Sequence, residues 1–311
     1  MKLFARNVNN YELYTNHAWY VPGVSGLFAL LGWFIAGNLL GSLVIVIFGL
    51  FVPHSVIEQY SMLVVYPLSF IPAMMYAASQ SQRSSLFETG YKLNNSHFGT
   101  YKGWQIGLIT FALSLATIMV ADFPNYLNLK LTSLSPGLSR FYDITVELLK
   151  SMTTGPFWSS FLLVAIFAPI FEEWLCRGMV LRGLLTKMKP GWAIVVSALF
   201  FAVIHMNPWQ ALNAFIIGVV MGYVYYKSGS LLLTMLIHFV NNGLAVVLAQ
   251  IPAYEEMEFF MDLFPSKLVY AVVYVAALAV LLACLMAFRR IPLEQERGNI
   301  DSVTLMPDGQ E

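Results

Sequence analysis

Long apolar segments separated by short polar breaks run through most of this chain, and they limit how it can fold more than any other feature. A helix needs roughly 20 consecutive apolar residues to cross the hydrocarbon core of a bilayer. Candidate segments lie at 27–52, 60–78, 104–121, 157–180, 191–206, 208–226, 230–250 and 267–288. These ranges predict an all-α fold, a polytopic membrane bundle of about eight transmembrane helices. The break at Asn207-Pro208 is the least certain boundary, because the segments on either side of it are short.

The composition supports a membrane protein and excludes several other classes. Only 11 % of the 311 residues are charged and 58 % are hydrophobic, whereas soluble proteins carry about 25 % charged residues. The formal net charge is zero and no basic run is present, so nucleic acid is not an expected partner. Cys176 and Cys284 lie in separate apolar segments, so neither a disulfide framework nor a thiolate zinc site is expected.

The distribution of Lys and Arg predicts a multi-pass protein of the cell membrane with both termini in the cytoplasm. If the eight segments alternate sides from a cytoplasmic N-terminus, twelve basic residues lie inside, four lie outside and Arg177 falls within a segment, which accounts for all 17. This bias follows the rule that basic residues favour the cytoplasmic loops. Seven segments would instead place Arg289 and Arg290 outside.

Ionisable residues at membrane depth cost about 2.5–3.5 kcal/mol each on insertion scales, so their positions are informative. The first group lies in A-P-I-F-E-E-W-L-C-R-G and contains Glu172, Glu173 and Arg177. Pro169 is expected to kink this helix. Adjacent helical residues point about 100° apart, so the two carboxylates cannot face one point. Glu173 and Arg177 have the i,i+4 spacing of an ion pair, which could be purely architectural, and Glu172 is left without a local partner.

Two further polar groups follow on later apolar segments. Phe201 and His205 are four residues apart, as are His238 and Asn242, so each pair shares one helix face. Asn241 points elsewhere and could bridge helices. Taken alone, each pair is equally well explained by hydrogen bonds between membrane helices.

Taken together, the three groups can carry out hydrolysis. A carboxylate near an imidazole can hold and deprotonate a water molecule. An imidazole and a carboxamide on a facing helix can donate hydrogen bonds to a developing oxyanion. The same side chains could instead hold a zinc ion through Glu172, His205 and His238, with water in the open position. The chain contains no H-E-x-x-H and no G-x-S-x-G motif, so other common hydrolase patterns lack support.

At these positions the sequence resembles the CAAX protease and bacteriocin-processing family of intramembrane peptidases, which includes the type II CAAX prenyl endopeptidases. The motifs of that family are E-E-x-x-x-R, F-x-x-x-H and H-x-x-x-N, and all three occur here in order on successive apolar segments. The resemblance covers about 157–250, and the first 150 residues carry no signature of it.

The resemblance implies an intramembrane endopeptidase in which Glu172 and His205 activate the attacking water. It implies that His238 and Asn242 stabilise the oxyanion. The substrate would be a peptide or membrane protein, with or without a lipid group, met in the bilayer. Members of the family are described both as metallopeptidases and as metal-free glutamate peptidases, so the resemblance leaves a zinc cofactor open.

The resemblance also implies supporting roles for Glu173, Arg177 and Phe201. A different class of function is a non-catalytic membrane protein, such as a transporter or bacteriocin-immunity factor, in which the polar residues bind a ligand or relay protons.

The site is expected in a cavity among the fourth, fifth and seventh segments, open toward the cytoplasm or the lipid. Glu172 lies in the cytoplasm-directed half of its segment and His205 lies nearer the outer side. A fourth helix that continues to about Thr186 would bring the two to one depth.

These expectations divide the chain into five regions. They are a cytoplasmic N-terminal segment (1–26), an N-terminal transmembrane region with an outer interfacial segment at 139–150 (27–150), the peptidase-like core (157–250), an acidic outer loop with the last helix (251–288) and a cytoplasmic tail (289–311).

Overall fold

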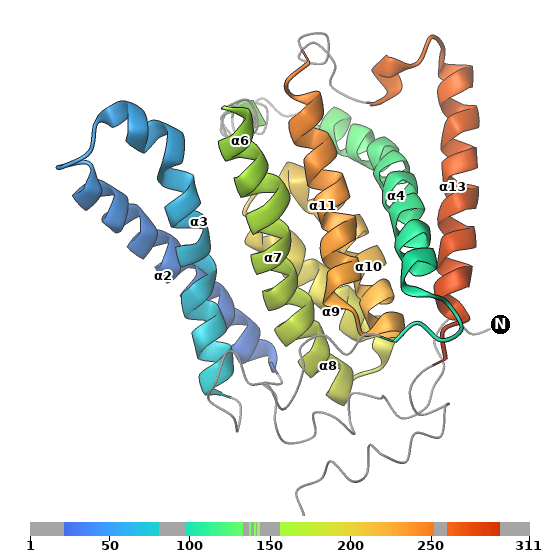
Figure 1. Ribbon diagram of the computed structural model, residues 1–311, viewed down its shortest axis with the longest axis horizontal. Helices are drawn as coiled ribbons and strands as arrows, with labels where there is room; N and C mark the ends of the chain where they lie inside the picture. Colours follow the sequence, from blue (N-terminus) through green and yellow to red (C-terminus); the bar gives the residue numbers. More distant parts are fainter. Residues whose placement is uncertain are drawn as a thin grey trace, which may run out of the picture.

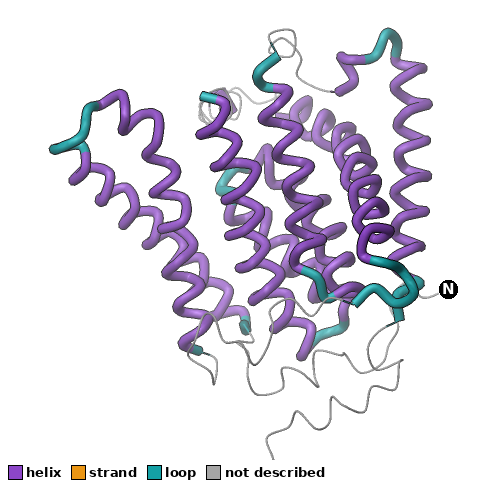
Figure 2. The backbone as a smooth tube through the Cα atoms, in the orientation of Figure 1, coloured by secondary structure: helices purple, strands orange, loops and turns teal. Residues whose placement is uncertain are grey.

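A computed structural model of the chain describes residues 22–80, 97–132, 137, 140, 142–143, 156–251 and 260–292. Every regular element in these ranges is a helix. Figures 1 and 2 show long helices packed side by side into a bundle. The predicted all-α membrane bundle is therefore confirmed. Of the predicted interfacial segment at 139–150, only residues 140, 142 and 143 are described.

Eight helical runs occupy the eight predicted segments within the described residues. They are α2 (Val24–Phe48), α3 (His54–Ser79), α4 (Gly103–Thr132), a compound run over 157–187, α9 (Pro190–Ile204), α10 (Pro208–Ser228), α11 (Leu231–Leu248) and α13 (Lys267–Arg289), with a short 3-10 turn η3 (Phe260–Leu263) before the last. Six of them are long and apolar enough to cross a membrane, and α9 is a shorter apolar helix. The predicted break between α9 and α10 is present. Asn207 caps the N-terminus of α10, since its Oδ1 accepts a hydrogen bond from the Trp209 amide at 3.0 Å, and Pro208 is the first residue of α10.

The fourth helical run is the least regular. It consists of α6 (Phe157–Ser160), the π-helical η1 (Phe161–Phe167), α7 (Ala168–Glu173), the π-helical η2 (Trp174–Leu181) and α8 (Arg182–Lys187). The run thus continues past Thr186, as expected if Glu172 and His205 lie at the same depth in the membrane. Glu172 consequently lies midway along the run and not in its cytoplasm-directed half. His205 follows the C-terminus of α9, whose 15 residues span about 22 Å, less than the hydrocarbon core of a bilayer.

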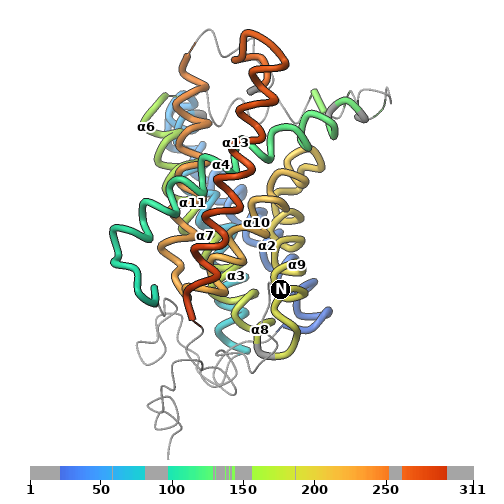
Figure 3. The backbone as a smooth tube through the Cα atoms, turned by 90° about the vertical axis from the view of Figure 1, so that its right-hand side faces the viewer, coloured from blue at the N-terminus to red at the C-terminus, as the bar shows by residue number. Residues whose placement is uncertain are grey.

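The helices alternate direction, and the start of α2 and the end of α13 lie at the same end of the bundle (Figure 1). Figure 3 shows α4 and α13 crossing the near face in the side view. These two helices are joined by a hydrogen bond from the Tyr270 hydroxyl to Asp122 at 2.9 Å.

The hairpin of α2 and α3 packs through glycines. A Cβ atom on Gly37 would lie 2.4 Å from the carbonyl oxygen of Leu68, and one on Gly41 would lie 3.0 Å from the Val65 Cα. Phe70, also on α3, lies 6.1 Å from Phe171 of α7, ring centroid to ring centroid. The hairpin therefore packs against the fourth helical run, as Figure 1 shows.

We expect Gly37→Ala to destabilise the protein, because the new methyl group overlaps the α3 backbone, which cannot move as a side chain can. Overpacking of this kind costs about 1–3 kcal/mol. Gly32→Ala is the matched control on the same helix, where a Cβ would meet nothing within 4 Å, and it should be neutral or stabilising by up to about 1 kcal/mol. Thermal unfolding in detergent micelles measures both, and equal midpoints for the two variants would contradict the close α2–α3 contact.

Candidate active site

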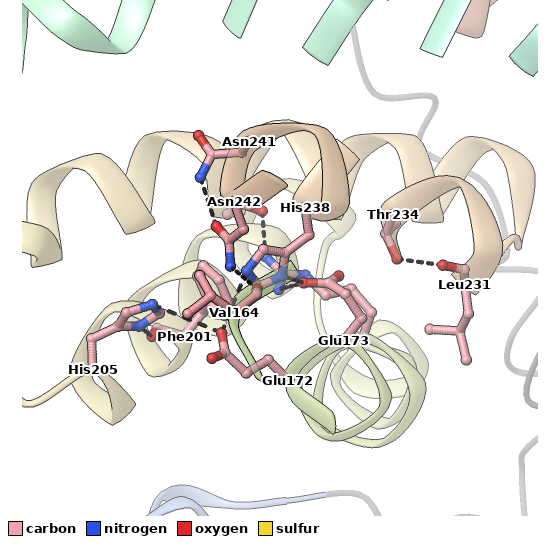
Figure 4. Close-up of polar contacts among 12 residues, drawn as sticks. Val164, Glu172, Glu173, Phe201, His205, Leu231, Thr234, His238, Asn241 and Asn242 are labelled. Atoms are coloured by element: carbon pink, nitrogen blue, oxygen red, sulfur yellow. Dashed lines mark hydrogen bonds and ion pairs between the residues drawn. The ribbon is translucent and has the colours of Figure 1, made fainter. Parts of the chain in front are cut away.

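The polar residues of the three sequence motifs come together in the middle of the bundle. Figure 4 shows the side chains of Glu172, His205 and His238 directed toward one another from α7, the end of α9 and α11. Glu172 Oε2 lies 3.8 Å from Nε2 of His205 and 3.8 Å from Nε2 of His238. Three helices far apart in sequence thus present one acid and two imidazoles to a common point.

Two of the three side chains that meet at this point are shielded from solvent. Glu172 and His238 are buried, whereas His205 is partly exposed. Glu172 Oε2 has no hydrogen-bond partner among the described residues. Its 3.8 Å distances to the two Nε2 atoms exceed direct hydrogen bonds, and one water molecule can bridge groups at such a separation. A buried carboxylate oxygen needs such a partner.

His238 lies between the two adjacent carboxylates. Its Nδ1 is 3.2 Å from Glu173 Oε1, and its Nε2 faces Glu172. Since an ionised carboxylate can only accept, Nδ1 carries a hydrogen and donates it to Glu173. The expectation that Glu172 and Glu173 point in different directions is met in this way, because they approach opposite nitrogens of one ring.

The predicted ion pair between Glu173 and Arg177 is present. Arg177 Nη1 donates to Glu173 Oε1 at 2.7 Å, and both side chains are fully buried. Arg177 Nη2 also donates to the Gly218 carbonyl of α10 at 3.1 Å. A Cβ at Gly218 would lie 3.3 Å from that nitrogen and 3.1 Å from the Ala198 Cβ. The glycine therefore lets α9 and α10 close around the guanidinium.

Phe201 explains why a phenylalanine precedes His205 by four residues. The guanidinium carbon of Arg177 lies 4.3 Å from the centre of the Phe201 ring, a cation–π distance. The imidazoles of His205 and His238 meet the same ring edge-on, with centroids 4.8 and 5.5 Å away. The buried Phe201 ring thus contacts Arg177, His205 and His238 and sets the spacing between them.

The backbone of α9 sets the tautomer of His205. Nδ1 of His205 lies 2.7 Å from the Phe201 carbonyl oxygen, which can only accept, so Nδ1 donates there. In the neutral ring Nε2 then carries a lone pair, and this is the atom that faces Glu172. His205 is therefore oriented as a proton acceptor.

Asn242 is held at both ends of its amide. Its Nδ2 donates to the Val164 carbonyl of η1 at 2.8 Å, and its Oδ1 accepts from Asn241 Nδ2 at 2.8 Å. Asn241, expected to point elsewhere, instead fixes which way the Asn242 amide faces. Figure 4 shows Asn242 on the His238 side of the cluster. The second Nδ2 hydrogen of Asn242 can still be donated to another acceptor.

Sequence reasoning missed one residue of the site. The hydroxyl group of Tyr66, on α3, donates a hydrogen bond to Glu172 Oε1. Tyr66 belongs to no motif, and as an aromatic residue in an apolar segment it looks like a lipid contact. One signal was available: membrane tyrosines favour the ends of helices at the bilayer interface, whereas Tyr66 lies in the middle of α3.

The three candidate zinc ligands have suitable donor atoms, slightly further apart than in a tetrahedral zinc site. Both Nδ1–H groups are held by acceptors, as in histidines that bind metals. Two donors that each lie about 2.0–2.2 Å from a tetrahedral zinc ion are about 3.3–3.6 Å apart, and Glu172 Oε2 is 3.8 Å from each Nε2. In the described part of the chain, no group of three or more His, Cys, Asp or Glu side chains is placed to hold an ion.

A comparison with protein families finds a match over the part of the chain that holds this site. The family model described as "Type II CAAX prenyl endopeptidase Rce1-like" matches residues 154–244. Its range contains every site residue described above except Tyr66. No curated protein and no solved structure matches the chain.

Proposed function

From the Rce1-like peptidase domain that residues 154–244 form, we propose that the protein is an intramembrane endopeptidase that cleaves a peptide bond with a water molecule held by Glu172 and His205. The observation that carries the proposal is the convergence of Glu172 Oε2 on the Nε2 atoms of His205 and His238. A peptidase family implies a peptide substrate, and the membrane helices imply that it is met in the bilayer.

The first step is attack by water. Glu172 Oε2 accepts one hydrogen of the water and His205 Nε2 accepts the other. As the water oxygen bonds to the peptide carbonyl carbon, one proton passes to this acid–imidazole pair. The Phe201 carbonyl supports the step, because it holds the His205 Nδ1–H and stabilises the imidazolium that proton transfer would create.

The second requirement is stabilisation of the oxyanion. His238 already donates from Nδ1 to Glu173, so it can donate from Nε2 only when it carries both hydrogens. The free Nδ2 hydrogen of Asn242 supplies a second donor. Groups fixed before the reaction in this manner stabilise a developing charge most effectively.

Collapse of the tetrahedral intermediate completes the reaction. The carbon–nitrogen bond breaks, and the proton taken from water passes to the leaving amine nitrogen, so that one carboxylic acid and one amine form. Glu173 and Arg177 take no part in bond making. Their buried pair holds Nδ1 of His238 in place.

The orientation in the membrane and the chemical nature of the substrate belong to the same proposal. We propose cytoplasmic termini, supported by the bias of Lys and Arg and by the common end at which α2 starts and α13 finishes. We propose a peptide or membrane-protein substrate, with or without a lipid group.

Glu172→Gln should abolish turnover, because an amide cannot accept the proton of the water, while the protein still folds and binds substrate. Quenched fluorescent peptides ending in a C-a-a-X sequence, with and without an isoprenyl group, measure this on purified protein. Asp262→Asn, which changes an exposed carboxylate in η3, is the control and should leave turnover intact. Peptide turnover that survives in Glu172→Gln would contradict the role of Glu172. A wild-type protein that cleaves none of these peptides would point instead to a transporter or immunity factor that uses the cluster for binding.

We propose that purified protein turns over without zinc, because Glu172 Oε2 and His205 Nε2 can hold and activate the attacking water between them. Elemental analysis should find well below one zinc ion per chain, and a chelator should leave turnover unchanged. Stoichiometric zinc that is lost in His205→Ala would establish the metal-dependent alternative through Glu172, His205 and His238.

A further inference from the structure

We infer that Tyr66, which lies outside the matched range, is a positioning residue that sets the orientation of the Glu172 carboxylate; the inference rests on the proposed function. A carboxylate on a flexible side chain can turn either oxygen toward the water site. The Tyr66 hydroxyl donates to Oε1, and Oε2 is the oxygen that faces the two imidazoles. The hydroxyl therefore selects which oxygen is presented and at what angle.

Tyr66 is itself held against α7. Its ring lies 5.2 Å from the ring of Phe70, one helical turn later on α3. Phe70 is 1 % exposed and stacks on Phe171, the neighbour of Glu172, at 6.1 Å. Two successive residues on one face of α3 thus dock onto two successive residues of the fourth helical run. These two contacts restrict movement of the Tyr66 phenol away from Glu172.

The adjoining side of α3 is held by α2. Ser69 accepts from Asn38 Nδ2 at 3.3 Å, and Gly41 brings α2 to within contact of Val65, the residue beside Tyr66. The hairpin of α2 and α3 therefore supports the position of the Tyr66 hydroxyl, which orients the Glu172 carboxylate. The polar residues of the site reach Glu172 from α9 and α11 on one side and from α3 on the other.

Tyr66→Phe tests the inference, because it removes the hydroxyl and keeps the ring that packs on Phe70. We expect kcat to fall about 10- to 100-fold, the range for one lost hydrogen bond to a charged group. KM should stay within about twofold, since the interaction acts on the water and not on substrate binding. The assay uses whichever C-a-a-X peptide the wild-type protein cleaves.

Tyr60→Phe is the matched control. It removes a hydroxyl from the same helix at an exposed residue, and it should change neither kcat nor KM. Unchanged kcat in Tyr66→Phe would overturn the inference, as would a lower unfolding temperature with unchanged kcat, which is the signature of a structural anchor only. Failure of the proposed function is distinct, because turnover would then survive in Glu172→Gln.

A second inference comes from the backbone of η1. The Ala168 amide bonds to the Leu163 carbonyl, in the i to i+5 pattern of a π-helix. The residue that would continue this pattern to the Val164 carbonyl is Pro169, which has no N–H. Neither backbone group that normally reaches Val164 supplies a hydrogen, and Asn242 Nδ2 donates to that carbonyl at 2.8 Å instead.

We infer that Pro169 is a positioning residue for Asn242, because it keeps the Val164 carbonyl available to the amide. Pro169→Ala restores an N–H that can bond to Val164 and displace Asn242. We expect kcat to fall several-fold with unchanged KM and no loss of stability, since alanine suits a helix better than proline. Pro124→Ala, at another proline inside a helix, is the control and should leave kcat unchanged.

The double variant Pro169→Ala/Asn242→Ala separates this role from a general effect on the helix. Loss of one oxyanion donor lowers kcat by about 10²–10³-fold, so the Asn242→Ala background remains measurable. If Pro169 acts through Asn242, its substitution should have no further effect in that background. Additive losses in the double variant would overturn the inference.

Discussion

The site depends on two adjacent buried carboxylates that the protein must neutralise within an apolar bundle. Glu173 is fully buried and has a fully buried guanidinium at 2.7 Å. An unpaired charge at such a position would cost several kcal/mol, so Arg177 makes the burial of Glu173 possible. The neutralised pair then anchors Nδ1 of His238. Because Nδ1 is held in this way, the orientation of the ring is fixed and its Nε2 faces Glu172.

Two histidines of the same type acquire different chemistry from the partner of Nδ1. The partner of His205 is the neutral carbonyl of Phe201, and the partner of His238 is an ionised carboxylate. Both acceptors fix Nδ1 as a donor, and the carboxylate forms the stronger, charge-assisted hydrogen bond. The two imidazoles therefore differ in the groups that hold their Nδ1 atoms.

Much of this arrangement could be predicted from the sequence because its signals are local. Apolar length predicted the helices, i,i+4 spacing predicted the Glu173–Arg177 pair, and three polar motifs predicted that their helices meet. The Tyr66–Glu172 hydrogen bond joins residues 106 positions apart, and no spacing rule reaches that far. The π-helical turns around α7 were also missed, because Pro169 predicts a kink but not how the surrounding backbone resolves it.

The π-helical turns and the N-terminal hairpin act on the same short helix. Because α7 lies between η1 and η2, a π-helical segment adjoins its six residues on either side. Within it Glu172 finds none of its polar contacts on its own helix: they come from α3, the end of α9 and α11. The matched range of 154–244 contains the groups proposed to react, but the acid among them, Glu172, accepts a hydrogen bond from α3. The site is thus a property of the whole bundle, and the first helices belong to it through that one hydroxyl.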